Sequence, residues 1–210
     1  QTAATLGATV TANGGAALSS RGTVYNTTGS PVTQNGAAEG GTAVEAFSHE
    51  RSSLSQGTQY FYRGYAVNAV GTAYSPQGSF YTEPGQASGV TFANVTATGM
   101  RITWTRGADS DGAIVVVRAG NSTVDEPVDG TQHSASATYG SQALGSSYVV
   151  FRGDDSSSAQ VDVTGLTAGT TYYVAVYAYK GTAADSGNDL GINYRQTSPA
   201  MGNKPTLAAE

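Results

Sequence analysis

One pattern occurs twice in the chain and constrains its fold more than any other feature. Residues 54–66 read LSQGTQYFYRGYA, and residues 166–178 read LTAGTTYYVAVYA. In each copy a turn containing Gly leads into a run of alternating apolar residues, which predicts a β-strand. Because such self-similarity indicates repeated architecture, the chain is predicted to hold two copies of one all-β unit.

The composition agrees with strands rather than helices. Thr, Val and the 13 Tyr residues suit a half-buried strand, whereas Ser and Thr lower helix propensity. A chain with 28 Gly and many Ser and Thr residues could also be disordered. The apolar residues, however, fall in compact alternating runs, which a solvated linker does not need. The sequence therefore predicts folded β-domains.

Strands separated by turn residues predict two β-sandwiches in series. In the first copy, residues 1–83, the expected strands are 5–10, 21–25, 43–47, 59–67 and 78–82. In the second copy, residues 84–204, they are 90–95, 100–105, 113–119, 147–152, 159–166, 171–180 and one near 195–203. The second copy also carries long insertions at 120–146 and 181–193, and residues 205–210 form a tail.

The repeated Leu-x-x-Gly-Thr-x-Tyr pattern resembles the tyrosine corner of fibronectin type III domains. The resemblance implies that Tyr60 and Tyr172 bond through their hydroxyls to the preceding main chain. Trp104 resembles the core Trp on the second strand of that family, whereas the matching strand of the first copy, TLGATV, carries no Trp. Two tandem immunoglobulin-like, fibronectin type III β-sandwiches are therefore expected.

Longer motifs extend the resemblance. Residues 84–205, with ITWT, VVVRAG, YVVFRG and VTGLTAGTTYYVAVYAY, resemble a fibronectin type III subfamily of secreted, multi-domain surface proteins of Bacteroidota-like bacteria. Residues 5–82 resemble a smaller module often found beside it. The resemblance implies a bacterial protein that is extracellular or on the cell surface. Such modules serve as spacers, adhesins and enzyme appendages.

The favoured function is non-catalytic and structural: a repeating unit of a surface fibre, filament or adhesin stalk. The expected partners are copies of the protein or neighbouring domains of the same chain. The alternative is an accessory module of a secreted hydrolase that binds carbohydrate, such as surface glycans, or protein. Exposed aromatic residues on one face would favour this alternative.

The first copy is expected to begin at its second strand and so to lack strand A. The segment KPTLAAE, residues 204–210, is a candidate strand A for a following domain or a neighbouring subunit, with Pro205, Thr206 and Leu207 at the interface. Strand addition of this kind would give head-to-tail polymers. The other explanation is a piece of a multi-domain protein with an irregular strand A.

Alternation places some aromatic residues on the outer face of the repeated strand. Tyr173 and Tyr177 lie opposite the corner Tyr in the second copy, and Phe61 and Tyr65 correspond in the first. Outward aromatic residues favour an interface with a partner or a carbohydrate. In the second copy, the insertion 120–146 could instead fold over them. The first copy has no comparable insertion, so Phe61 and Tyr65 are the better interface candidates.

Charge and residue types argue against several functions. The net charge is −5 and the chain has two Lys, so nucleic-acid binding has no electrostatic basis. There is no Cys, and His49 and His133 lie outside any catalytic or zinc-binding arrangement. No apolar run approaches the ~18 residues of a membrane span. The chain is therefore expected to be neither an enzyme nor the carrier of a cofactor.

Two further patterns are candidates for sites. Asp109 and Asp111 precede Gly112 in a turn, a pattern like part of a calcium loop, but a solvated turn is the favoured explanation. Three Asn-x-Thr sequons, at Asn26, Asn94 and Asn121, are candidates for glycosylation if the host glycosylates.

Overall fold

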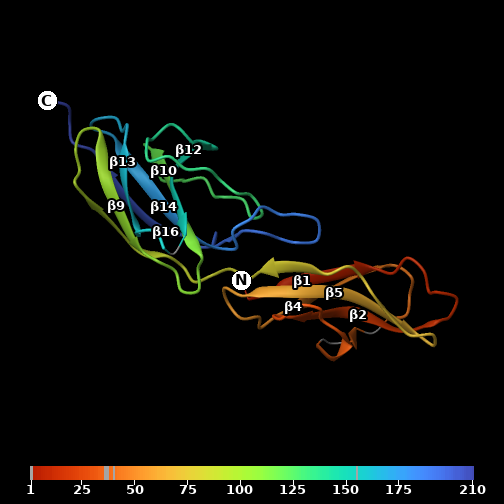
Figure 1. The fold of residues 1–210 in the computed structure, drawn as a ribbon. Helices are drawn as coiled ribbons and strands as arrows, with labels where there is room; N and C mark the ends of the chain where they lie inside the picture. Colours follow the sequence, from red (N-terminus) through yellow and green to blue (C-terminus); the bar gives the residue numbers. More distant parts are fainter. Residues whose placement is uncertain (1, 36–37, 40, 155) are drawn as a thin grey trace. The chain divides into compact units, whose positions relative to one another are not determined.

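The computed structural model describes residues 2–35, 38–39, 41–154 and 156–210, and consists of strands joined by turns, with one short 3₁₀ helix, η1 (Thr33–Asn35) (Figure 1). Two compact units are present. The first comprises Gln1–Thr82 with Asp185–Gly191, and the second comprises Glu83–Ala184 with Ile192–Glu210. Within the described ranges, no helix is long and apolar enough to cross a membrane.

The second unit is a sandwich of two antiparallel sheets. Its strands are β8 (Ser88–Ala93), β9 (Gly99–Thr105), β10 (Gly112–Ala119), β11 (Ala143–Leu144), β12 (Ser147–Asp154), β13 (Gln160–Thr164), β14 (Thr171–Lys180), β15 (Asn193–Tyr194) and β16 (Ala200–Pro205). One sheet has the order β13-β9-β8; β13 and β9 are labelled in Figure 1. The other has the order β11-β12-β10-β14, with β15 and β16 both paired to β14. This is the strand order of a fibronectin type III domain.

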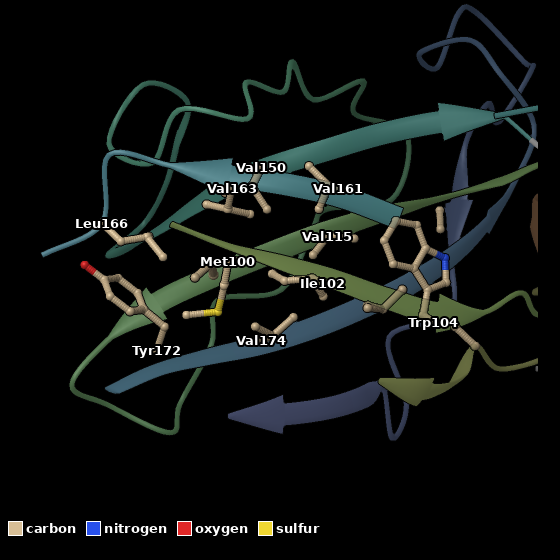
Figure 2. Close-up of a cluster of buried hydrophobic side chains, with 14 of the residues drawn as sticks. Met100, Ile102, Trp104, Val115, Val150, Val161, Val163, Leu166, Tyr172 and Val174 are labelled. Carbon is tan, nitrogen blue, oxygen red and sulfur yellow. The ribbon is translucent and has the colours of Figure 1, made fainter. Parts of the chain in front are cut away.

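Alternating burial along β9 builds the core of the second unit. Met100, Ile102 and Trp104 are buried and point between the sheets, whereas the residues between them are half-exposed (Figure 2). From the facing sheet, Val115 and Val174 meet them in the same cluster. Period-two alternation therefore fixes which face of β9 is buried.

The central strands β10 and β14 are buried on both faces. Their inner residues join the core between the sheets, and their outer residues form a second apolar cluster with parts of the two insertions. Members of this outer cluster are Ile114, Val116, Val124, Val149, Ala175, Tyr177, Tyr179, Ile192 and Tyr194. Burial on both sides explains the near-continuous apolar runs AIVVV and YYVAVYAY, which lack a polar face.

The first unit repeats the same architecture with fewer strands. Its strands are β1 (Ala4–Thr9), β2 (Leu18–Asn26), β3 (Ala38–Glu39), β4 (Ala46–Arg51), β5 (Gln59–Asn68), β6 (Thr72–Tyr74) and β7 (Gly78–Tyr81). β1 and β4 pair in one sheet, and the other has the order β3-β2-β5-β6, with β7 also paired to β5. The expected fold of two tandem sandwiches is confirmed. Among the residues that the structure describes, no counterpart of β8 pairs with β1.

The interior of the first unit is small and partly polar. Its apolar cluster is built from Leu6, Leu54, Tyr60 and Phe80. Beside that cluster, the buried Arg21 guanidinium lies 4.8 Å from the centre of the Phe47 ring and bonds to Glu45 at 3.0 Å. Arginine thus occupies space that apolar side chains fill in the second unit, so the first unit has less hydrophobic stabilisation.

Two predicted strand positions were wrong. The strand expected at 43–47 is β4 at Ala46–Arg51, and Val44 is exposed. Pairing with β1, from Ala4 opposite Arg51 to Thr9 opposite Ala46, sets the position of β4 although its sequence is polar. The last strand, expected near 195–203, is the short β15 followed by β16.

Candidate functional site

Both sandwiches contain the same hydrogen-bonded corner. The backbone N–H of Ser55 donates to the hydroxyl oxygen of Tyr60 at 2.9 Å, and that of Thr167 donates to Tyr172 at 2.8 Å. Both Tyr rings are buried. Figure 2 shows the Tyr172 ring against Leu166, with its hydroxyl directed towards the turn. The corner therefore ties the start of β5 or β14 to the preceding turn.

A threonine after the last strand completes each corner. The hydroxyl of Thr82 accepts from the N–H of Thr58 at 2.9 Å and donates to the carbonyl of Ser55 at 2.6 Å. The sequence analysis did not identify Thr82. Its signal was position: a Thr directly follows the last strand of each copy, at a larger spacing in the second copy because the insertion 181–193 precedes its last strand.

Thr206 repeats this arrangement in the second unit. Its hydroxyl accepts from Thr170 N–H at 3.0 Å and donates to the Thr167 carbonyl at 2.7 Å. Each sandwich therefore ends in a lock, defined here as Tyr60 with Thr82 in the first unit and Tyr172 with Thr206 in the second. The lock joins the final strand to the turn before the neighbouring strand.

The structure corrects the prediction that Pro205, Thr206 and Leu207 lie at an interface with another domain or subunit. Pro205 is the last residue of β16 and pairs with Thr171, and Thr206 is buried. The N–H of Leu207 donates to the Thr96 carbonyl, and its own carbonyl accepts from Gly169, although its side chain is exposed. These three residues are hydrogen-bonded or paired within their own sandwich, so they are not free to serve as strand A of another domain or subunit.

Breaking one lock is expected to weaken only its own unit. Thr206→Val removes the hydroxyl and leaves the Thr170 N–H without its side-chain acceptor, so the second unit should lose about 1–3 kcal/mol. Thr82→Val should have the same effect on the first unit. Hydrogen exchange of the full chain, followed by mass spectrometry, separates the two units. Equal loss of protection in both units from either variant would contradict independent locks.

The outward tyrosines of the second unit are not an exposed surface. Tyr177 is buried, and Tyr173 is half-buried and packs against the outer apolar cluster. Val124, from the first insertion, and Ile192, from the second, cover this face. The structure thus corrects the interface prediction for Tyr173 and Tyr177, and the alternative of a covering insertion holds.

Burial of tyrosine hydroxyls predicts a loss of stability in alkali. Burial raises the pKa of Tyr177 well above its ordinary value of 10.0, and the nearby charges of Glu126 and Asp125 add to the shift. Burial also raises the pKa of Tyr194. Unfolded tyrosine ionises near pH 10, so this contribution is fully present below about pH 10 and is lost as the pH rises further.

The expected result is a urea midpoint for the second unit that falls between about pH 9 and about pH 11. Tyr177→Phe should reduce this fall, because it removes the group with the largest shift. A midpoint that declines equally in the variant and the parent would contradict the role of Tyr177.

The first-unit candidates are also less exposed than expected. Tyr65 is buried, and its ring lies 6.5 Å from that of Tyr74. The hydroxyl of Tyr74 accepts from the Thr33 N–H at 3.0 Å, and Pro31 is buried nearby in sequence. Tyr65 is thus a buried side chain beside Tyr74, which corrects the interface prediction for Tyr65. Phe61 is half-buried at the start of β5.

Trp104 packs at one end of the core between the sheets. Its ring makes an edge contact with Phe151, with centroids 5.0 Å apart. Its indole Nε1 is buried, and no hydrogen-bond acceptor for it is found in the part of the chain that the structure describes. A cavity of about 10 Å³ adjoins the ring. The contribution of Trp104 to stability is therefore apolar contact.

The acidic turn has an internal counter-ion. The Asp111 carboxylate accepts from Lys180 Nζ at 2.6 Å and from the Gly181 N–H at 2.9 Å, whereas Asp109 is exposed. Searching the described residues for three or more His, Cys, Asp or Glu side chains able to hold a metal ion gives no group. A lysine beside Asp111 is unfavourable for a divalent cation, because like charges repel.

The three sequon asparagines lie in turns. Asn26 ends β2 and its side chain bonds to Gly29, Asn94 is exposed with φ of 49°, and the Asn121 side chain accepts from the Thr123 N–H at 2.9 Å. Local bonds of this kind hold Asn in turn conformations. Such bonds account for Asn26 and Asn121 as turn residues.

A polar cavity of about 430 Å³ lies on the second unit beside its first insertion. Gln132, His133, Ser134, Ala135 and Arg152 line it. The Arg152 guanidinium lies 5.4 Å from the centre of the Tyr179 ring, and burial lowers the pKa of His133. Donor groups therefore surround this cavity. Sequence reasoning did not find it, because the insertion carries no recognised motif.

One family model matches part of the chain, mainly in the second unit. The family model "Purple acid Phosphatase, N-terminal domain" matches residues 86–189. No curated protein sequence is significantly similar to the chain.

Solved structures give low-identity matches. The chicken CNTN1 FN1-FN3 domains are 13% identical, with a TM-score of 0.46, over 99% of this chain and 61% of that chain. A two-domain fibronectin type III segment of chicken tenascin is 18% identical, with a TM-score of 0.41, over 89% and 83%. A redesigned β-sandwich protein is 16% identical, with a TM-score of 0.38, over 60% and 97%.

Proposed function

We propose that the chain is a non-catalytic, extracellular tandem module that acts as part of a surface fibre or adhesin stalk. The observation that carries the proposal is the lock at the end of each sandwich. Thr82 and Thr206 make equivalent bonds, so each unit is closed at the point where its last strand leaves it. Tension on the chain would act on the final strand at this point.

The geometry of the final strand supports a mechanical role. β16 pairs with β14 over six residues, from Ala200 opposite Val176 to Pro205 opposite Thr171. Pulling along the strand loads these bonds together with the Thr206 lock, instead of opening them one after another. The partners in this proposal are neighbouring domains of the same chain or other copies. Strand exchange through residues 204–210 is not part of it, since the tail bonds within its own unit.

Single-molecule stretching of the full chain between handles tests the proposal. Two separate unfolding events are expected, one for each unit, and Thr206→Val should lower the force of only one of them. A chain that extends without force peaks would overturn the stalk role.

The non-catalytic part of the proposal has its own test. No hydrolysis of phosphate esters or glycosides is expected, with or without added divalent metal. Hydrolysis that is abolished by mutating residues of the polar cavity would overturn the non-catalytic assignment.

A second candidate is an accessory domain of a secreted hydrolase. The match of residues 86–189 to the N-terminal domain of purple acid phosphatases favours it, together with the polar cavity beside Arg152. Binding to insoluble polysaccharides or a glycan array would test it. Binding that is lost in Arg152→Ala and kept in Arg101→Ala, whose arginine lies on β9 in the other sheet, would favour this candidate over the stalk.

A further inference from the structure

The polar cavity of the second unit lies on the outer face of the larger sheet. Arg152, on β12, is directly opposite Ile114 of β10, which belongs to the outer apolar cluster. Residues that are directly opposite in an antiparallel pair share one face, so the Arg152 side chain stands on that outer face. The first insertion supplies the rest of the lining: Gln132, His133, Ser134 and Ala135.

Buried tyrosines hold the Arg152 side chain. Its guanidinium carbon lies 5.4 Å from the centre of the Tyr179 ring, and the guanidinium also lies beside the Tyr194 hydroxyl. Both rings are buried, and the Tyr194 hydroxyl donates to the Thr131 carbonyl at 3.0 Å. The arginine is therefore ordered before any ligand arrives, which lowers the entropy cost of binding.

Arg152 has no carboxylate partner among the residues that the structure describes. Its Nε is buried without a hydrogen-bond acceptor in the same part of the chain. Several other cations of the second unit do have such a partner: Arg101 with Asp162, Arg118 with Asp125, Lys180 with Asp111, and Arg195 with Glu83. Because a partly buried charge without a counter-ion is unfavourable, an anion bound beside Arg152 would be stabilised.

His133 is a neutral donor in the lining. The Val128 N–H donates to Nε2 of His133 at 3.3 Å, so Nε2 carries no proton and the ring proton lies on Nδ1. Burial and the nearby charge of Arg152 lower the pKa of His133, in agreement with a neutral ring. The lining therefore has one positive charge, that of Arg152.

A single positive charge favours a carboxylate over a phosphate. A guanidinium matches the planar geometry of a carboxylate and binds it through two parallel hydrogen bonds. A phosphate monoester carries about two negative charges near neutral pH, which one arginine does not neutralise. The net charge of −5 on the chain also disfavours ligands of high negative charge.

The uncharged part of the lining suits a sugar. Ser134 provides a hydroxyl, and Gln132 donates through Nε2 to the Thr182 carbonyl at 3.1 Å, which leaves its Oε1 as an acceptor. Groups of this kind exchange hydrogen bonds with sugar hydroxyls. The volume of about 430 Å³ lies within the range of small-molecule sites.

We propose that this cavity binds a sugar that carries one carboxylate, which is the chemistry of a uronic acid. Arg152 binds the carboxylate, and Ser134 and Gln132 bind sugar hydroxyls. The inference rests on the carbohydrate-binding part of the second candidate function and names the class of sugar. The stalk role does not enter into it.

Titration of the full chain with D-glucuronate, followed by NMR, tests the proposal. Saturable shifts of the amides of residues 132–135 are expected. Arg152→Gln keeps a polar side chain and removes the charge, so binding should weaken by about tenfold or more, since a charged hydrogen bond is lost. Arg101→Ala, on β9 in the other sheet, is the matched control and should bind like the parent. Unchanged amide shifts away from the cavity confirm that each variant is folded.

The uncharged methyl ester of glucuronate and D-glucose should bind far more weakly than glucuronate. Equal binding of the ester would overturn the inference and leave a carbohydrate-binding role standing. Equal shifts with acetate or inorganic phosphate would reveal a general anion site, and an absence of shifts with glucuronate would reveal no site; either result would overturn the inference. Glucuronate binding without binding to any polysaccharide would support the inference and contradict the accessory-domain candidate.

Discussion

Replacing Trp104 by Ala is expected to destabilise the second unit by about 3–5 kcal/mol, the usual cost of truncating a buried Trp. The side chain is 6% exposed and contacts Phe151 at one end of the core. The first unit should keep its stability, because Trp104 belongs to the core of the second unit. Urea unfolding followed by hydrogen exchange in both units measures the effect.

Two variants sharpen this prediction. Trp104→Phe keeps an aromatic ring and removes the buried Nε1 donor that lacks an acceptor, so its cost should be much smaller than that of Ala. Thr105→Ala, at the exposed neighbour on β9, should have little effect. A loss in Trp104→Phe as large as that in Trp104→Ala would mean that the indole N–H is important, contrary to the structure.

Replacing Gly64 by Ala is expected to destabilise the first unit by about 1–3 kcal/mol, a typical cost of overpacking. A Cβ at Gly64 would lie 2.2 Å from the Cβ of Ala8, far inside contact distance, so the two sheets would have to separate. The apolar cluster of this unit is small, so such a loss is a large part of its stability. Exchange of the β1 and β5 amides is the measurement.

A second substitution provides the control. Ala8→Gly in the Gly64→Ala background removes the opposing Cβ and should restore much of the lost stability. Ala8→Gly alone should cost about 0.5–1 kcal/mol, because Gly weakens a strand. The double variant is thus expected to lose less stability than the sum of the two single losses. Additive losses in the double variant would contradict the close approach of β1 and β5.

The same pair of residues explains the missing tryptophan of the first copy. Thr2 and Thr98 accept equivalent backbone bonds from the Leu that opens the repeated pattern in each copy. Alignment through this pair places Ala8 where the second unit has Trp104. An indole at Ala8 could not fit over β5, where even a methyl at Gly64 would clash. The first copy therefore combines a small residue on β1 with Gly on β5, and the buried Arg21 occupies part of its interior.

The predictions of side-chain exposure were wrong where the residues that bury a side chain lie far from it in the sequence. Alternation correctly divided β14 into two faces, and Tyr172 lies on the core side as expected. The burial of Tyr177 depends on insertions whose own sequences have no regular pattern, and Tyr65 is buried beside Tyr74 of β6. Period-two patterns report the two faces of a strand, but they do not show whether a loop covers the outer one.

The repeated Leu-x-x-Gly-Thr-x-Tyr pattern by itself determined that the protein has two sandwiches of one kind, because a turn and a corner tyrosine are local features. Only the tertiary structure decided how each sandwich closes. Thr82 and Thr206 bond to turns that lie far back in the sequence, and β1 pairs with β4 across the intervening β2 and β3. Such long-range pairing depends on which strands meet in space, and a local sequence pattern does not encode it.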